Sequence, residues 1–378
     1  MEMVCTRCIM TNKGDPTITF DKNGYCSYCS DALNRMKESY FPNAEGKKRL
    51  ECLLNEIKEK GKNSKYDCIM GISGGIDSSY LLYLGSKWNL RILAIHINDG
   101  FDTEISKSNI KKLIEKTQCD YVEVVPDPEQ YANINKAYLK AGVPNIAIPQ
   151  DNILFAELHA QMKKYKIHYF LTGANFSLES ILQKGNTYDA YDVVQIKDIF
   201  KKYGSGKIDK LTFMSTAARE KDKIVLKYKT VAPLDLVDYK RDNAFEELKD
   251  FCGYEYYGRK HLENIFTAFV QLYWLPRKFN VDKRTSHLSS MIISGQMTRD
   301  EALQEMSQPI YDEDMMNEYI SIIKENTNIS DDEFKAIMNA PPRSHEDFKK
   351  ETDSLSYKLI RIAWRTLCFI GLYKKVDE

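Results

Sequence analysis

The sequence predicts an α/β protein in which a parallel-sheet domain follows a small cysteine-rich unit and precedes a helical C-terminal region. Three observations predict this. Short apolar runs alternate with amphipathic segments of helix length between residues 66 and 172, as in βαβ units whose sheet is covered on both faces. Two C-x₂-C pairs lie near the N-terminus, and the spacing beyond Asn243 is mostly helical. The 378 residues suffice for two or three units, with expected boundaries at 1–45, 46–242 and 243–378.

The first segment carries Cys5, Cys8, Cys26 and Cys29, out of nine cysteines in the chain. An odd total without a leader argues against a disulfide framework. Four thiolates at this spacing predict a structural Zn²⁺ in a zinc ribbon, with no ligand position left for catalysis. A hairpin turning at Asn23-Gly24 would join the pairs. Metal-free redox pairs are the alternative.

The next elements follow in order along the chain. A connecting helix is expected over 46–62. Strands are expected at 66–72, 91–97, 121–125 and 169–172, with helices at 77–88 and 106–117 and two more within 128–165. Residues 183–210 are polar and turn-rich, which fits either a mobile loop over a site or an ordinary surface insertion. The chain then becomes helical, and its aromatic residues Phe266, Phe269 and Trp274, with Leu275, favour a helix core over a sugar platform.

Composition limits the partners. Lys+Arg and Asp+Glu balance at 54 each, whereas nucleic-acid-binding proteins usually carry a basic excess. No apolar stretch is long enough to span a membrane, and the N-terminus does not read as a secretory signal. We therefore expect a cytoplasmic protein with no membrane partner. Because the chain has no excess of basic residues, we do not expect a nucleic-acid partner either.

The stretch "MGISGGIDSS" at 70–79 joins a strand to a helix through a glycine turn. Gly74 and Gly75 can adopt positive φ, and backbone N–H groups with a helix N-terminus suit an anion. The lysine of the usual phosphate loop is absent. The pattern S-G-G-x-D-S at 73–78 resembles the pyrophosphate-binding loop of N-type ATP pyrophosphatases, the PP-loop enzymes of the adenine nucleotide alpha hydrolase-like (HUP) fold.

That resemblance implies cleavage of ATP between the α- and β-phosphates. It also implies a set of nucleotide-binding residues at the ends of the strands: Ile72, Ser73, Gly74, Gly75, Asp77, Ser78, Ser79, His96 and Gly173. Asp77 is the expected catalytic residue, helping to hold the Mg²⁺ that screens the triphosphate. For His96, which ends the run "LAIHIND", a core histidine is the alternative.

A second resemblance rests on "YGRKHLENIFTAFVQLYWLPRKFNVDKRTSHLSSMIISGQMTRDEAL" at 257–303, together with the C-x₂-C pairs and the loop. It is to the N-acetyl sugar amidotransferases of bacterial surface-glycan and lipopolysaccharide biosynthesis, and within them to the pseudaminic acid branch that serves flagellin glycosylation. The resemblance implies that an acetamide oxygen attacks ATP and that ammonia then displaces AMP. The substrate would be a sugar or a sugar nucleotide.

The ammonia source and the basic residues follow from this. The chain has neither an N-terminal nucleophilic cysteine nor a G-x-C-x-G elbow, so a glutaminase paired with a cyclase-like partner would supply ammonia. Lys260 and His261 are expected to be catalytic. An anionic sugar would bind Arg277, Lys283, Arg284 and His287, although a solvated helix face would explain the same residues.

Two other functions stay open. A tRNA-modifying PP-loop enzyme, such as a thiolase or a lysidine-synthetase-like protein, is the first, because some tRNA thiolases also carry zinc knuckles. The isolated cysteines Cys68, Cys119 and Cys252 and the balanced charge count against it. A non-enzymatic zinc-ribbon scaffold is the second, and it would leave the phosphate loop without a purpose.

Overall fold

The computed structural model describes residues 2–258, 262–354, 357, 358, 362 and 366. Its centre is a sheet of five parallel strands in the order β3-β2-β1-β4-β5. The strands are β1 (Cys68–Gly71), β2 (Ile92–Ile97), β3 (Asp120–Val124), β4 (Tyr169–Leu171) and β5 (Lys229–Val231). The connecting helices are α3 (Ile76–Lys87), α4 (Glu104–Thr117), α5 (Pro128–Ala141), α6 (Ile148–Tyr165), α7 (Phe176–Glu179), α8 (Val193–Tyr203) and α9 (Thr216–Leu226).

Successive side chains of each strand face opposite sides of the sheet. Cys68 and Met70 pack into one hydrophobic cluster with α3 and α4, while Ile69 packs into another with α6. Both faces of the sheet are therefore covered, which confirms the predicted α/β architecture. The predicted strands and helices up to residue 172 all form, with ends that differ by one or two residues.

Two features differ from the sequence prediction. The short strand β5, which extends the sheet beside β4, was missed. The polar segment 183–210 is not a loop throughout, because it contains α8, whose Ile196 and Ile199 are fully buried in the cluster that α5 also enters. Turn-rich sequence on both sides of this helix concealed its apolar face.

The C-terminal region is helical, as predicted, and adds a second layer of core. Its helices are α10 (Arg241–Cys252), α11 (Ile265–Phe269), α12 (Leu275–Phe279), α13 (Arg284–Ile293), α14 (Arg299–Ser307), α15 (Glu313–Thr327) and α16 (Asp331–Asn339). A π-helical turn at Val270–Trp274 links α11 to α12. Helix α12 begins with Leu275-Pro276, and the ordinary helical hydrogen-bond pattern is interrupted there because proline has no N–H to donate. The four residues expected in the core are all buried: Phe266, Phe269, Trp274 and Leu275.

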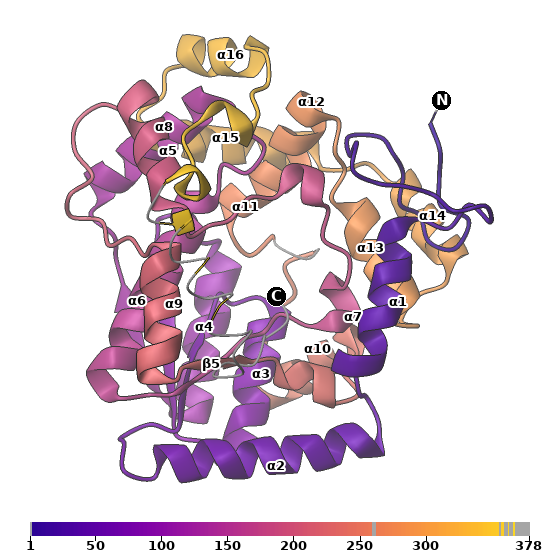
Figure 1. Ribbon diagram of the computed structural model, residues 1–378, viewed down its shortest axis with the longest axis vertical. Helices are drawn as coiled ribbons and strands as arrows, with labels where there is room; N and C mark the ends of the chain where they lie inside the picture. The colour runs from indigo at the N-terminus through magenta and orange to yellow at the C-terminus, as the bar shows by residue number, and fades with distance from the viewer. Residues whose placement is uncertain (1, 259–261, 355–356, 359–361, 363–365, 367–378) are drawn as a thin grey trace.

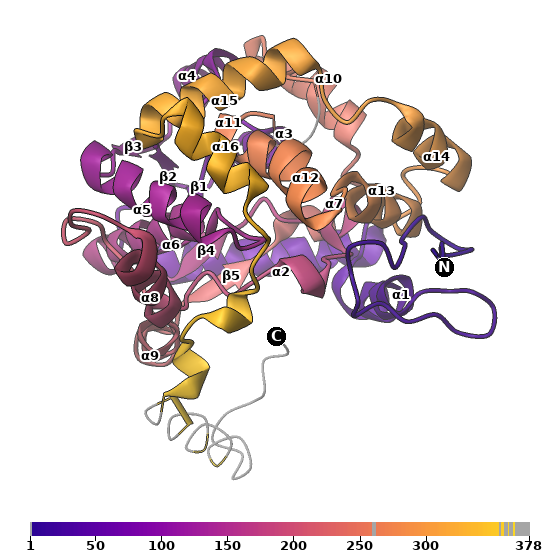
Figure 2. The same ribbon diagram turned by 90° about the horizontal axis from the view of Figure 1, so that it is seen from above.

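The N-terminal segment and its helix α1 (Ser27–Ser39) lie on one side of the molecule with α14, opposite α8 and α9 (Figures 1 and 2). The guanidinium of Arg299 donates hydrogen bonds to the carbonyl oxygens of Cys8 and Cys5, at 3.1 and 3.4 Å. The helix α2 (Ala44–Gly61) then runs along the base of the molecule in Figure 1. Within the described residues, no helix combines the length and apolar character needed to cross a membrane.

Candidate functional site

For this strand order, a ligand-binding crevice is expected at the carboxyl ends of β1 and β4. The chain leaves the β3 edge of the sheet and re-enters it at β4, on the other side of β1. Ligands of doubly wound sheets bind where the order reverses in this way. Two loops meet there, since a Cβ added to Gly173 would lie 3.1 Å from the backbone nitrogen of Ser78. Gly173 thus lets the loop after β4 approach the start of α3.

The loop after β1 has a backbone conformation that favours glycine at Gly74, whereas Gly75, which was also expected to adopt positive φ, has φ −74°. Gly74 has φ +76°, and a Cβ there would lie 2.6 Å from the carbonyl oxygen of Ser106. A Cβ on Gly75 would lie 2.7 Å from Oε1 of Glu263. The loop ends at the N-terminus of α3, where the first-turn N–H groups have no acceptor within the helix. This arrangement is suited to an anion.

Serine side chains line the same loop. Ser73 is exposed, its N–H donates to Oγ of Ser78 at 3.3 Å, and its own Oγ accepts from the Gly75 N–H at 3.2 Å. Ser79 is fully buried, so its hydroxyl is not presented to the crevice. Ile72 is also buried and donates its N–H to the carbonyl oxygen of Ile95.

Three tyrosines from distant segments hold this loop, and sequence reasoning missed them. The hydroxyl of Tyr254 donates to the carbonyl oxygen of Gly74 at 2.6 Å, and that of Tyr257 accepts from the Ile76 N–H at 3.0 Å. The hydroxyl of Tyr239 donates to Asp77. Burial, followed by the charge of Asp77, raises the pKa of Tyr239 well above its usual value. The run "YEYY" at 254–257 was the one sequence signal that could have pointed to Tyr254 and Tyr257.

Glu263 was also missed, although it lies two residues beyond the predicted pair Lys260 and His261. The backbone of 263–265 pairs with 101–103, with Thr103 N–H donating to the Glu263 carbonyl at 3.1 Å and Ile265 N–H to the Phe101 carbonyl at 2.7 Å. This pairing brings the Glu263 carboxylate against Gly75. Lys260 and His261 themselves lie outside the described residues.

His96 lies beneath the loop rather than in the crevice. It is 5% exposed, its Nδ1 lies 2.8 Å from the carbonyl oxygen of Ile72, and its Nε2 lies 2.8 Å from Oδ2 of Asp102. Because the Ile72 carbonyl oxygen and the Asp102 carboxylate both accept hydrogen bonds, His96 and Asp102 share a proton between Nε2 and Oδ2. Burial opposes the charged ring, but the hydrogen bond and charge of Asp102 outweigh it and raise the pKa of His96. With both ring nitrogens engaged, His96 supports the loop.

The predicted substrate-binding residues lie on α12 and at the start of α13. Arg277 donates to the hydroxyl of Tyr311 at 2.8 Å, and Arg284 forms an ion pair with Asp282 at 2.8 Å. Lys283 donates to Oδ1 of Asn186 at 2.9 Å, and burial lowers its pKa to about 8. His287 follows one turn later on α13. Lys283 thus contacts Asn186, whereas the guanidinium of Arg284 contacts Asp282 and the carbonyl oxygens of Glu305 and Gln308, so these two side chains reach different segments.

The four N-terminal cysteines converge, as the sequence predicted. All four are fully buried, and their sulfur atoms lie within 4.8 Å of one another. Cys5 and Cys29 are 3.8 Å apart at Sγ, and Cys8 and Cys26 are 3.6 Å apart. Tetrahedral bonds of about 2.3 Å to zinc would separate sulfurs by about 3.8 Å, whereas a disulfide needs about 2.0 Å. The predicted turn is present at Gly24, with one antiparallel bridge between Phe20 and Cys26.

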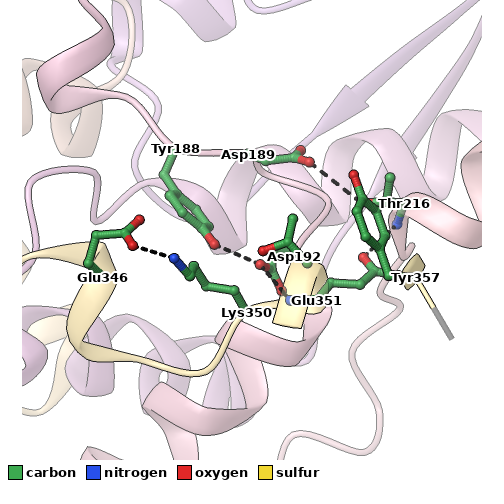
Figure 3. A pocket seen from close by; sticks show the side chains of 9 residues that line it. Tyr188, Asp189, Asp192, Thr216, Glu346, Lys350, Glu351 and Tyr357 are labelled. Atoms are coloured by element: carbon green, nitrogen blue, oxygen red, sulfur yellow. Dashed lines mark hydrogen bonds and ion pairs between the residues drawn. The ribbon is translucent and has the colours of Figure 1, made fainter. Parts of the chain in front are cut away.

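A separate polar cavity of about 220 Å³ lies between the segment 188–192, the start of α9, residues 346–352 and Tyr357 (Figure 3). Figure 3 shows Tyr188 and Asp192 pointing toward one another. The Tyr188 hydroxyl donates a hydrogen bond to Oδ2 of Asp192 at 2.7 Å. Asp192 also accepts two hydrogen bonds from the Glu351 N–H, each 3.0 Å. None of the nine lining residues belongs to the loop 72–79, and the hydrogen bonds of Asp192 link the segment 188–192 to Glu351.

Comparison with known proteins adds a domain-level match. Residues 263–363 match the family described as "LPS biosynthesis protein WbpG-like, C-terminal domain". A search of curated proteins finds no match. Among solved structures, the chain is similar to NMN synthetase from Francisella tularensis, at 14% identity and TM-score 0.29, over 55% of this chain and 92% of that one. It is also similar to the NH3-dependent NAD synthetase from Campylobacter jejuni in complex with nitrate, at 14% identity and TM-score 0.30, over 79% and 98%. At these TM-scores neither likeness carries an argument about function.

Proposed function

We propose that this chain is an ATP-dependent, AMP-forming amidotransferase that converts an N-acetyl group of a bacterial surface sugar into an acetamidino group. The observation that carries the proposal is the glycine loop 72–75, placed at the point where the strand order reverses and followed by the N-terminus of α3. The loop has no lysine for a γ-phosphate but can surround a pyrophosphate with N–H groups. The match of residues 263–363 to a lipopolysaccharide-biosynthesis family supports a sugar substrate.

In the proposed reaction, the acetamide oxygen attacks the α-phosphorus and pyrophosphate leaves, forming an O-adenylyl imidate. Ammonia attacks the imidate carbon and loses a proton, and AMP departs with the former acetamide oxygen. Nitrogen thereby replaces oxygen on the sugar. The substrate we propose is pseudaminic acid or a related nonulosonate, bound by Arg277, Lys283, Arg284 and His287, with Lys260 and His261 as the proposed catalytic residues together with Asp77.

The chain's donor groups fit the two metals that the proposal implies. Asp77, bonded to Tyr239, and Glu263, packed on Gly75, would place carboxylates beside a polyphosphate. Mg²⁺ bound to such oxygen ligands would screen the phosphate charge. The four buried sulfurs fit Zn²⁺, which would stabilise the N-terminal segment at its contact with α13 and α14.

The ammonia donor we propose is a partner glutaminase with a cyclase-like subunit, and the domain boundaries we propose remain 1–45, 46–242 and 243–378. The direct test is mass spectrometry of N-acetylated nonulosonates incubated with the protein, ATP and ammonium. A product lighter by the difference between O and NH supports the proposal. AMP formation that requires tRNA instead of a sugar would support the tRNA-modifying alternative.

A further inference from the structure

The loop at residues 72–79, called the phosphate loop below, carries too little positive charge for the pyrophosphate that we propose it binds. Residues 72–79 contain no lysine or arginine, and the carboxylates of Asp77 and Glu263 lie at the loop. A helix N-terminus supplies only about half an elementary charge. Magnesium pyrophosphate still carries a net negative charge, so a cationic side chain from another segment would strengthen its binding beyond the Mg²⁺ proposed above.

Arg241 is placed to supply it. It is the first residue of α10, two residues after Tyr239, whose hydroxyl donates to Asp77. Its Nη2 donates to the hydroxyl of Tyr256, and its guanidinium carbon lies 5.2 Å from the centre of that ring. The Tyr256 ring lies 5.6 Å from the ring of Tyr257, which accepts the Ile76 N–H of the loop. Arg241 is thus connected to the loop by two routes, one through Tyr239 and Asp77 and the other through Tyr256 and Tyr257.

The charge of Arg241 interacts with groups that contact the loop. Burial opposes it, but Tyr256, Tyr257, Asp77 and Tyr239 together raise the pKa of Arg241. Within the described part of the chain, Arg241 forms no ion pair with a carboxylate at 4.0 Å or less. The adjacent Lys240 is exposed and lies 3.5 Å from Asp238, which makes it a matched control.

We propose that Arg241 binds the β- and γ-phosphates of the nucleotide, and the pyrophosphate they become, in place of the lysine that the loop lacks. Tyr256 is the positioning residue that fixes its guanidinium. This inference rests on the proposed function, because it assumes that the loop binds the pyrophosphate half of ATP. Arginine can hold two phosphate oxygens at once, which a lysine ammonium does less well.

The test is calorimetric binding of magnesium pyrophosphate and, separately, of AMP to the full chain. Arg241→Gln should weaken pyrophosphate binding about 10- to 100-fold, as expected for one charged hydrogen-bonding group, and leave AMP binding unchanged. Arg241→Lys should retain part of the affinity. Tyr256→Phe, which keeps the ring and loses the hydroxyl, should fall between wild type and Arg241→Gln. Lys240→Gln should match the wild type.

The outcomes separate the two proposals. If the wild type binds pyrophosphate and Arg241→Gln binds it equally well, Arg241 is not the phosphate-binding cation. If Lys240→Gln weakens binding as much as Arg241→Gln, the effect is general surface charge and the assignment is wrong. If the wild type binds neither pyrophosphate nor ATP, the proposed function itself fails. Should Arg241→Gln not fold, as judged by its thermal melt, the Arg241→Lys and Tyr256→Phe pair decides by the same measurement.

Discussion

The hydroxyl of Tyr239 donates a hydrogen bond to the carboxylate of Asp77, although 162 residues separate them. The contact links the segment after β5 to the first turn of α3. Asp77 belongs to the loop that the sequence identifies, while Tyr239 belongs to no motif. The relationship thus joins a locally encoded loop to a part of the chain that only the tertiary fold brings near.

We expect Tyr239→Phe to lower AMP formation and to cost about 1 to 3 kcal/mol of stability, because the half-buried carboxylate of Asp77 loses one hydrogen-bond donor. Steady-state AMP release and chemical denaturation measure the two effects. The matched control is Tyr138→Phe: Tyr138 is fully buried, and its hydroxyl makes no hydrogen bond to the described residues. If Tyr138→Phe lowers AMP formation and stability as much as Tyr239→Phe does, the hydrogen bond from Tyr239 to Asp77 has no special role.

Gly74→Ala should abolish nucleotide binding. Its positive φ costs a side chain about 1–2 kcal/mol, and the new Cβ would lie 2.6 Å from the Ser106 carbonyl oxygen. Gly295 has the same φ of +76° with nothing within 4 Å of its added Cβ, so Gly295→Ala carries the backbone cost alone. Equilibrium binding of ATP to both variants separates strain from contact. If both variants bind ATP like the wild type, the loop does not hold the nucleotide.

Cys8→Ser should release the metal that we propose for the cysteine cluster. One of four buried ligands is lost, and since metal binding is coupled to folding, the N-terminal segment should become sensitive to proteolysis. Elemental analysis of zinc per chain measures the first effect and limited proteolysis the second. Cys52→Ser, at an exposed cysteine of α2, should change neither. Wild-type protein purified without zinc, yet resistant to proteolysis, would favour the metal-free alternative.

The His96–Asp102 pair predicts how stability varies with pH. The pKa of His96 is raised in the folded chain, mainly because its hydrogen bond and charge interaction with Asp102 overcome burial. The stabilisation it gives is therefore complete below the unfolded pKa of about 6.5 and is lost as pH rises through the folded pKa. The difference in melting temperature between wild type and Asp102→Asn should shrink over that alkaline range. A difference that does not vary with pH would show that the pair does not titrate as described.

The sheet and the loop could be predicted because their signals are local. Short continuous apolar runs set the buried strands, and Gly74 and Gly75 set a turn between strand and helix. The convergence of four cysteines likewise follows from two short spacings and a turn at Gly24. Each of these depends on residues close together in the sequence.

The support of the loop could not be predicted in the same way. Glu263 reaches Gly75 where 263–265 pairs with 101–103, and Tyr254 reaches Gly74 beside Glu255, whose backbone exchanges two hydrogen bonds with the Asn109 side chain. No periodicity encodes that docking. His96 was expected beside the nucleotide from its place at the end of a strand. Its two acceptors, Ile72 and Asp102, instead hold its ring beneath the loop.

The measurement that tests the central claim most directly is identification of the products of ATP in the presence of an N-acetylated nonulosonate and ammonium. Phosphorus NMR of the reaction should show AMP and pyrophosphate accumulating together, in proportion to the amidine formed. ADP and inorganic phosphate as the products would contradict the assignment of the loop at 72–79 to pyrophosphate release, and with it the proposed function.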